Sequence, residues 1–178
     1  SFNGVSIMTG TGYVSANFSA WGGFATTILL IVMFIGGCGG STTCGIKVFR
    51  LQVLASTAKV QISRLLRPHA VVLAYYNKRP VSVEVMDSVM GFFYLFILGF
   101  VLIAIMLGMA GLDFVTALSG AATSISNVGP GLGEVIGADG NFSTLPNSAK
   151  WIMSFAMLLG RLEIFTVLVM LNPAFWQR

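Results

Sequence analysis

Backbone carbonyls are the groups in this chain that could most readily do chemistry. The stretch SISNVGPGLG, residues 124–133, ends with three glycines and a proline within five residues. No charged residue lies between Phe114 and Gly133, so this is not an ordinary water-exposed loop. Unwound backbone at membrane depth is tolerated where it is buried in protein or lines a water-filled path. Its carbonyls can then replace the hydration shell of a cation.

The composition predicts an all-α membrane protein. Hydrophobic residues make up 56% of the 178 residues and charged residues only 9%, against about 25% charged in a soluble domain. Apolar runs cover residues 1–46, 88–112 and 151–176, the last broken only by Arg161 and Glu163. Each run can hold the roughly 20 apolar residues that span a bilayer. Because the chain starts at Ser1 and is apolar from the outset, we expect it to be a fragment of a longer protein.

The distribution of charge predicts the orientation. Of ten Lys and Arg residues, seven lie between the first and second apolar runs, which makes that segment cytoplasmic by the positive-inside rule. The net charge of +4 is therefore an orientation signal and gives no reason to expect nucleic-acid binding. The seven are Lys47, Arg50, Lys59, Arg64, Arg67, Lys78 and Arg79.

Three spans follow from this orientation. The first runs inward, from about Trp21 to Gly45, and the second runs outward over about 82–108. Ser82 is suited to cap the second helix, and Glu84 suits its first turn. The third span returns inward over about 148–171 and ends before Pro173.

A half-length helix should precede the glycine stretch. Asp113 can cap a helix from Phe114 to about Ile125, which at about 18 Å would cross only half a membrane. The partial negative charge at its C-terminus would favour a cation. Residues 2–8 and 9–13 repeat this order of short apolar stretch and glycine loop. The chain therefore contains one truncated and one complete copy of a span, pore helix and span unit.

A second glycine cluster lies late in the first span. Five glycines in ten residues destabilise a helix by roughly 1 kcal/mol each, which favours an unwound segment inside the membrane. A face of small residues for helix packing is the alternative. The cluster comprises Gly36, Gly37, Gly39, Gly40 and Gly45, with Ser41, Thr42 and Thr43 among them.

Other chemistry is poorly supported. Cys38 and Cys44 have no histidine near them, so a zinc site lacks ligands, and they are interpreted as apolar fillers or a disulfide pair. Residues 40–45 have the spacing of a phosphate-binding loop, but Ile46 stands where its lysine is required. His69, the single histidine, lies in the cytoplasmic segment. We expect this protein not to be an enzyme.

Four segments together resemble one family. They are IGGCGGSTTCGIKVFR (35–50), RPHAVV (67–72), TSISNVGPGLG (123–133) and GRLEIFT (160–166). In order and spacing they resemble the C-terminal part of the TrkH family, within the bacterial Trk/Ktr superfamily of potassium uptake proteins. The resemblance implies a potassium-channel-like fold with four span, pore-helix and span repeats around one pore, in a homodimer of the bacterial inner membrane.

The resemblance also implies the parts of the pore. Residues 1–46 would end the third repeat, 47–81 would be the basic cytoplasmic segment, and 82–178 would be the fourth repeat, with its span at 82–108, pore helix at 113–125, filter at 126–133 and last span at 148–171. Potassium, the one ion or cofactor implied, would bind the backbone carbonyls of the filter glycines of the two repeats. The implied filter residues are Thr11, Gly12 and Tyr13, and Asn127, Val128 and Gly129.

Gating and partners are implied in the same way. Residues 36–45 match an intramembrane loop beneath the filter, with gating residues Gly36, Gly37, Gly39, Gly40, Ser41 and Thr42. Thr43 and Cys44 depart from the pattern, because many relatives have two glycines there. The family's partner is a ring of cytoplasmic nucleotide-binding, TrkA-like regulatory subunits, which the basic segment is well placed to meet.

Arg161 is the residue of the third span with the highest free-energy cost of insertion into the membrane. A central arginine costs about 2.5–3.5 kcal/mol on insertion scales. Glu163 is a poor partner, because two residues on a helix diverge by about 200°. Arg161 would therefore either hydrogen-bond loop carbonyls and tie helices together, or face the pore beneath the filter. GRLEIFT matches the segment that carries the pore arginine of the family.

Two other functions remain open. Glycine segments that only pack helices would make this chain a non-transporting membrane scaffold. Broken helices at a binding site would suit a secondary transporter of another substrate, although the membrane midplane offers few recognition side chains besides Arg161. The sequence leaves open whether potassium flux is channel-like or coupled to protons or sodium.

Overall fold

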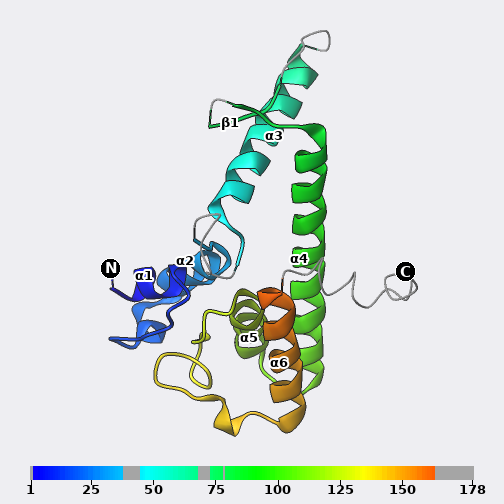
Figure 1. Cartoon of the computed structure of the whole chain (residues 1–178). Coiled ribbons are helices and arrows are strands. Elements are labelled where there is room, and N and C mark those ends of the chain that lie inside the picture. Colours follow the sequence, from blue (N-terminus) through cyan, green and yellow to red (C-terminus); the bar gives the residue numbers. More distant parts are fainter. Residues whose placement is uncertain (1, 38–44, 68–72, 78, 163–178) are drawn as a thin grey trace, which may run out of the picture.

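The protein folds almost entirely as helices. A computed structural model describes residues 2–37, 45–67, 73–77 and 79–162. Figure 1 shows the order of its elements along the chain. They are α1 (Phe2–Met8), a 3-10 turn η1 (Phe18–Trp21), α2 (Gly23–Phe34), α3 (Val48–Leu66), β1 (Tyr75–Tyr76), β2 (Arg79–Pro80), α4 (Val83–Met109), α5 (Phe114–Ser126), η2 (Phe142–Thr144) and α6 (Asn147–Arg161).

The longest helix, α4, forms the axis of the fold. Its 27 residues extend over about 40 Å, and within the described residues it alone is long and apolar enough to cross a membrane. Ser82 stands at its N-cap position as expected, but its side chain makes no capping hydrogen bond. The expectation of a Ser82 cap is therefore corrected: the helix begins there without that contribution.

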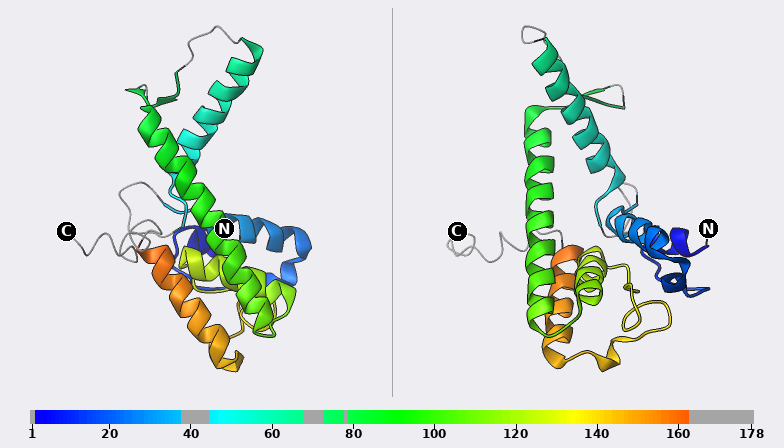
Figure 2. Two further views of the ribbon diagram at one scale, coloured as in Figure 1. Left: turned by 90° about the vertical axis from the view of Figure 1, so that its right-hand side faces the viewer. Right: turned by 180° about the vertical axis from the view of Figure 1, so that it is seen from behind.

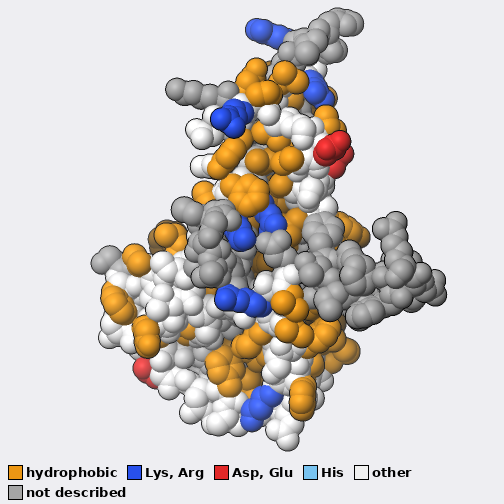
Figure 3. All heavy atoms as spheres, in the orientation of Figure 1, with side chains coloured by type: hydrophobic (Ala, Val, Ile, Leu, Met, Phe, Trp, Pro, Cys, Tyr) orange, Lys and Arg blue, Asp and Glu red, His pale blue; other side chains and the backbone are white. Residues whose placement is uncertain are grey.

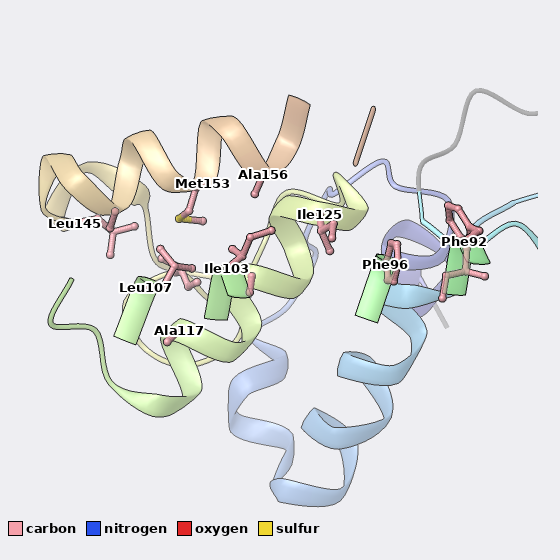
Figure 4. Packing of buried hydrophobic residues seen from close by; sticks show 13 residues of the cluster. Phe92, Phe96, Ile103, Leu107, Ala117, Ile125, Leu145, Met153 and Ala156 are labelled. Atoms are coloured by element: carbon pink, nitrogen blue, oxygen red, sulfur yellow. The ribbon is translucent and has the colours of Figure 1, made fainter. Parts of the chain in front are cut away.

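The half-length helix α5 occupies the centre. Most of its residues from Thr116 onward are buried, because α4 and α6 pack on one side and α1 and α2 on the other (Figure 2). Ala117, Ala121 and Ile125 belong to the core shared with α4 and α6. Figure 4 shows Ile103 and Leu107 of α4 meeting Met153 of α6 beside α5. The small side chains of α5 allow neighbours to approach it on every side.

The first span differs from a single continuous helix. Helix α2 ends at Phe34, and Ile35 is extended, so a helix of 12 residues covers the first part of the predicted span from Trp21 to Gly45, and the chain is non-helical at residues 35–37, where the glycines begin. Ile35 and Ile46 then pair in a short parallel bridge. Glycine destabilises a helix interior through its conformational freedom, which explains why the helix stops where the glycines begin.

The β1–β2 hairpin packs on α3, and helix α6 is the last described helix of the chain. Ser56 of α3 holds the small hairpin, since its hydroxyl donates to the Tyr75 carbonyl (3.1 Å) and accepts from the Tyr75 amide (3.2 Å). Helix α6 begins at Asn147 and ends at Arg161, short of the predicted end at Leu171. Glu163 and the rest of that predicted span lie outside the described residues.

Candidate functional site

The site is built on α5, whose start is fixed by a cap. The Asp113 carboxylate accepts a hydrogen bond from the Thr116 amide at 3.3 Å. The hydrogen bond from the Thr116 side chain, with smaller backbone contributions and against the opposing effect of desolvation, lowers the pKa of Asp113. The capped helix starts within a residue of the predicted position, because an N-cap aspartate acts locally.

At its other end, α5 turns into the glycine loop through Asn127. Asn127 takes the left-handed conformation, with φ 51° and ψ 43°. The Val128 amide then donates to the Thr123 carbonyl at 3.1 Å. The Gly129 amide donates to the Thr123 hydroxyl at 3.0 Å. The loop is thus tied back to the last turn of the helix that carries it.

Helix α1 ends in the same way. Gly10 is left-handed with φ 70°, at the position that Asn127 holds after α5. The Thr11 amide donates to the Ser6 carbonyl at 3.0 Å, and the Gly12 amide donates to the same carbonyl at 3.3 Å. Ser6 stands six residues before Gly12, as Thr123 stands before Gly129. The two copies inferred from pattern alone therefore share a left-handed residue and a matching hydrogen bond from the loop to the helix, although the Gly12 amide donates to a backbone carbonyl and the Gly129 amide to a hydroxyl.

The two glycine loops meet. A Cβ on Gly12 would lie 2.6 Å from the Val128 carbonyl oxygen and 3.1 Å from Pro130 Cδ. A Cβ on Gly129 would lie 3.9 Å from Gly12 Cα. Gly12 and Gly129 have φ of +75° and +111°, values that side-chain-bearing residues rarely adopt. The fold thus places the two predicted filter glycines next to each other, although they come from distant parts of the chain.

The other predicted filter residues are placed differently from one another. Val128 is buried, whereas Tyr13 is 73% exposed. The Thr11 hydroxyl shares a hydrogen bond of 2.8 Å with the Thr9 hydroxyl. What these positions have in common is their place in the two meeting loops, which makes backbone carbonyls a better basis for a shared site than side chains.

Ser119 is a supporting residue that sequence reasoning missed. Its hydroxyl, buried in α5, accepts from the Leu132 amide at 3.1 Å and donates to the Leu132 carbonyl at 3.2 Å. Thr123 lies four residues later, on the same helix face. The spacing of these two hydroxyl residues, just before a glycine loop, is the sequence signal that could have predicted their contacts with the loop. Together they hold the loop at its beginning and its end.

Helix α6 presses against the end of α5. The Asn127 side-chain amide donates to the Met157 carbonyl at 3.0 Å. A Cβ on Gly160 would overlap the Ile125 carbonyl oxygen and lie 3.0 Å from Asn127 Nδ2. Arg161 follows as the last residue of α6, with an exposed side chain. The close approach to the end of α5 therefore occurs at Gly160, the residue that directly precedes the predicted pore arginine.

Backbone hydrogen bonds join the two ends of the glycine cluster of the first span. The paired residues, 34–37 and 45–48, are called the neck here. The Gly36 amide donates to the Ile46 carbonyl at 2.9 Å, and the Ile46 amide donates to the Phe34 carbonyl at 2.8 Å. Gly45 has φ +83°, and a Cβ there would lie 3.2 Å from the Phe34 carbonyl oxygen. Of the predicted gating residues, Gly36 and Gly37 belong to the neck. The remaining predicted residues of the gating loop, Gly39, Gly40, Ser41 and Thr42, lie outside the described residues. Thr43 and both cysteines also lie outside them.

The basic segment starts directly after this neck. Most of the Lys and Arg side chains visible in Figure 3 lie over the half of the molecule that contains α3. Arg50, in the first turn of α3, places its guanidinium carbon 3.8 Å from the centre of the Phe92 ring of α4. Such a cation–π contact fastens α3, and with it one side of the neck, to the long helix. Lys78 and His69 lie outside the described residues.

A short helix and a half-length helix whose glycine loops meet beside a long apolar helix define a membrane protein of the pore-loop architecture. The chain belongs to the TrkH family: the sequence profile described as "TrkH: Cation transport protein" matches residues 1–178. Because this is a family of transport proteins, the expectation that the chain is not an enzyme is confirmed.

Known relatives cover the chain from end to end. It is 48% identical over 177 residues to the Trk system potassium uptake protein TrkI of Halomonas elongata, covering 99% of this chain and 36% of that protein. It is 37% identical to TrkH of Escherichia coli over 99% of this chain and 36% of that protein. The crystal structure of the potassium transporter TrkH from Vibrio parahaemolyticus matches with a TM-score of 0.87 at 40% identity, covering 97% of this chain and 36% of that one. The chain thus spans about a third of the length of these relatives.

Proposed function

We propose that this chain supplies the later part of the third repeat and the whole fourth repeat of a protein that takes up potassium across the bacterial inner membrane. The observation that carries the proposal is the meeting of Gly12 and Gly129 in loops of similar geometry. A ring of filter carbonyls requires similar loops from repeated units. The names of the relatives, all potassium uptake proteins, support the choice of ion.

Residues 11–13 and 127–129 form two of the four sides of the filter in this proposal. Potassium is the substrate, and it binds the backbone carbonyls of Gly12 and Gly129. The C-terminal ends of α1 and α5 point their partial negative charge toward it. The remaining sides come from the part of the relatives that this chain does not cover.

The gate lies on the cytoplasmic side of the filter. It consists of residues 36–45, held at the neck, together with Arg161. The charge of Arg161 raises the barrier for a cation that leaves the filter, and its donors can hold free loop carbonyls.

The basic segment faces the cytoplasm and binds a TrkA-like nucleotide-binding regulatory subunit. The positive-inside distribution supports the orientation. The Arg50–Phe92 contact supports a mechanical link, because a force on α3 reaches both the neck and α4. The assembled protein is a multi-pass homodimer in this proposal.

Complementation tests the function. The full-length parent protein is expressed in bacteria that cannot grow on low potassium, and growth is expected to be restored. Absence of rescue with the protein present in the membrane would contradict potassium uptake. If rescue fails and purified protein carries another solute, the secondary-transporter interpretation is favoured; if it carries none, the scaffold interpretation is favoured.

A further inference from the structure

The two repeats use different residues at the left-handed position that follows each short helix. Each of the two short helices is followed by a left-handed residue two positions before the filter glycine; this residue is Gly10 after α1 and Asn127 after α5. Glycine adopts this conformation at little cost, whereas asparagine adopts it less readily. The backbone alone therefore gives no reason for an asparagine at this position in the fourth repeat.

The side chain of Asn127 accounts for the difference. Its amide nitrogen lies 3.0 Å from the carbonyl oxygen of Met157, in a partly buried position between α5 and α6. Gly160, one turn further along α6, leaves room for this contact, because a Cβ there would lie 3.0 Å from the same nitrogen. The amide thus points into the packing between helices, on the side of the loop that faces α6.

This contact stands between two functional elements. Gly129 follows Asn127 by two residues, and its amide is already fixed by the Thr123 hydroxyl at 3.0 Å. Arg161 follows Met157 by one helical turn. A hydrogen bond from Asn127 to Met157 therefore sets the position of the filter loop relative to the helix that carries the arginine.

We propose that Asn127 is a positioning residue for ion selectivity, which fastens the fourth-repeat filter loop to α6 through its side-chain amide. The inference rests on the proposed function, in which Gly129 contributes a carbonyl to the filter. Asn127 acts through Met157 and not by contacting the ion with its side chain. Without the amide, the loop can shift against α6, and the Gly129 carbonyl loses its fixed distance from the ion.

The test compares potassium and sodium uptake by the full-length parent protein in liposomes. Asn127→Gly keeps the left-handed backbone, as Gly10 does in the third repeat, and removes only the amide. We expect the potassium-to-sodium uptake ratio to fall about three- to tenfold, the range set by one neutral hydrogen bond. Thermal stability should change little, because the relief of left-handed strain offsets the lost hydrogen bond.

Asn77→Gly is the matched control. Asn77 is the other non-glycine residue with positive φ in the described part of the chain, at 47°, and it is exposed in the cytoplasmic hairpin. This variant should leave the uptake ratio unchanged. Asn127→Asp keeps the shape of the side chain but presents only acceptors when ionised. It should lower the uptake ratio at least as far as Asn127→Gly. If Asn127→Gly cannot be purified, Asn127→Asp tests the proposal by the same ratio.

The ratio is measured per reconstituted molecule, so it separates positioning from folding. A ratio that stays at the wild-type value in the Asn127 variants, with or without a loss of folded protein, would overturn the proposal and leave Asn127 as a helix cap. Gly129→Ser is measured alongside. If it lowers the ratio while the Asn127 variants do not, only the positioning role fails; if it too has no effect, the filter assignment itself fails.

Discussion

Gly12 and Gly129 lie close enough that a Cβ added to Gly129 would come within 3.9 Å of Gly12 Cα. They belong to loops that follow two different half-helices, and both have positive φ. The surroundings of the two glycines nevertheless differ. A Cβ on Gly12 would collide with the Val128 carbonyl, whereas a Cβ on Gly129 would make only ordinary contact. Backbone conformation is therefore the main constraint at Gly129, and conformation and space both act at Gly12.

Gly129→Ser should reduce ion selectivity without blocking insertion into the membrane. A side chain at φ +111° costs about 1–3 kcal/mol of backbone strain, which the loop can relieve by turning its carbonyls. We expect the potassium-to-sodium uptake ratio to fall about fivefold or more, and Gly12→Ser to have a larger effect. Gly108→Ser, at a helical glycine with open space around it, is the control. Unchanged selectivity in Gly129→Ser would remove Gly129 from the filter.

Changes to the glycine loop should affect gating. Gly45→Ala places a Cβ at φ +83° and 3.2 Å from the Phe34 carbonyl oxygen, which loosens the neck. We expect flux per molecule in liposomes to rise and to depend less on the regulatory partner, and shortening residues 36–45 should act in the same direction. Less folded protein with unchanged flux per molecule would instead favour the packing-face interpretation of the glycines.

Arg161→Ala should fold, insert and conduct faster. At an effective dielectric of about 20, a unit charge roughly 10 Å from the ion would add about 1.7 kcal/mol to the barrier, so flux should rise about 15- to 20-fold. Arg161→Lys should be intermediate, because it keeps the charge and loses the planar guanidinium. Single-channel or liposome recordings decide the matter. Loss of folding, or flux and gating equal to the parent protein, would leave Arg161 as a tie between helices.

Gly160→Ala should destabilise the packing of α6 on α5. The added Cβ would overlap the Ile125 carbonyl oxygen, a backbone atom that cannot rotate away. Overpacking of this kind costs about 1–3 kcal/mol. Gly99→Ala is the matched control, since its Cβ would lie 3.5 Å from the Ile125 side chain, and the change should be neutral or stabilising. Thermal unfolding in detergent compares the two, and equal melting temperatures would contradict the close approach of α6.

The Asp113 cap should give α5 a pH-dependent contribution to stability. Because its pKa is lowered in the folded protein, the contribution is present above the unfolded value of 3.8 and is lost as the pH falls through the folded pKa. Asp113→Ala should cost about 0.5–2 kcal/mol near neutral pH. Asp113→Asn should keep the cap and remove this part of the pH dependence. Melting curves near pH 7 and about pH 3 test both variants. If the melting temperature of the parent protein changes with pH as much as that of Asp113→Asn, the carboxylate of Asp113 does not contribute to the pH dependence of stability.

Local signals in the sequence determined most of the helices. The uncharged run after Asp87 predicts α4, and Asp113 predicts the start of α5, because apolar length and capping act within one helix. The unwound chain after Phe34 follows from five glycines in ten residues. Positive φ at Gly12 and Gly129 agrees with the glycine loops predicted there.

Only the tertiary structure decided which of these elements meet. The contacts of Gly12 with Val128, of Asn127 with Met157 and of Arg50 with Phe92 join residues on separate elements. No local propensity specifies such pairs, because they depend on how separate elements pack against each other. The same packing directs the side chain of Asn127, a residue expected from resemblance to belong to the filter, toward α6. The sequence by itself determined where the chain is helical and where it must unwind. The packing around α5 decided that the two unwound loops face each other, since a half-length helix is held in place only by the surfaces that bury it.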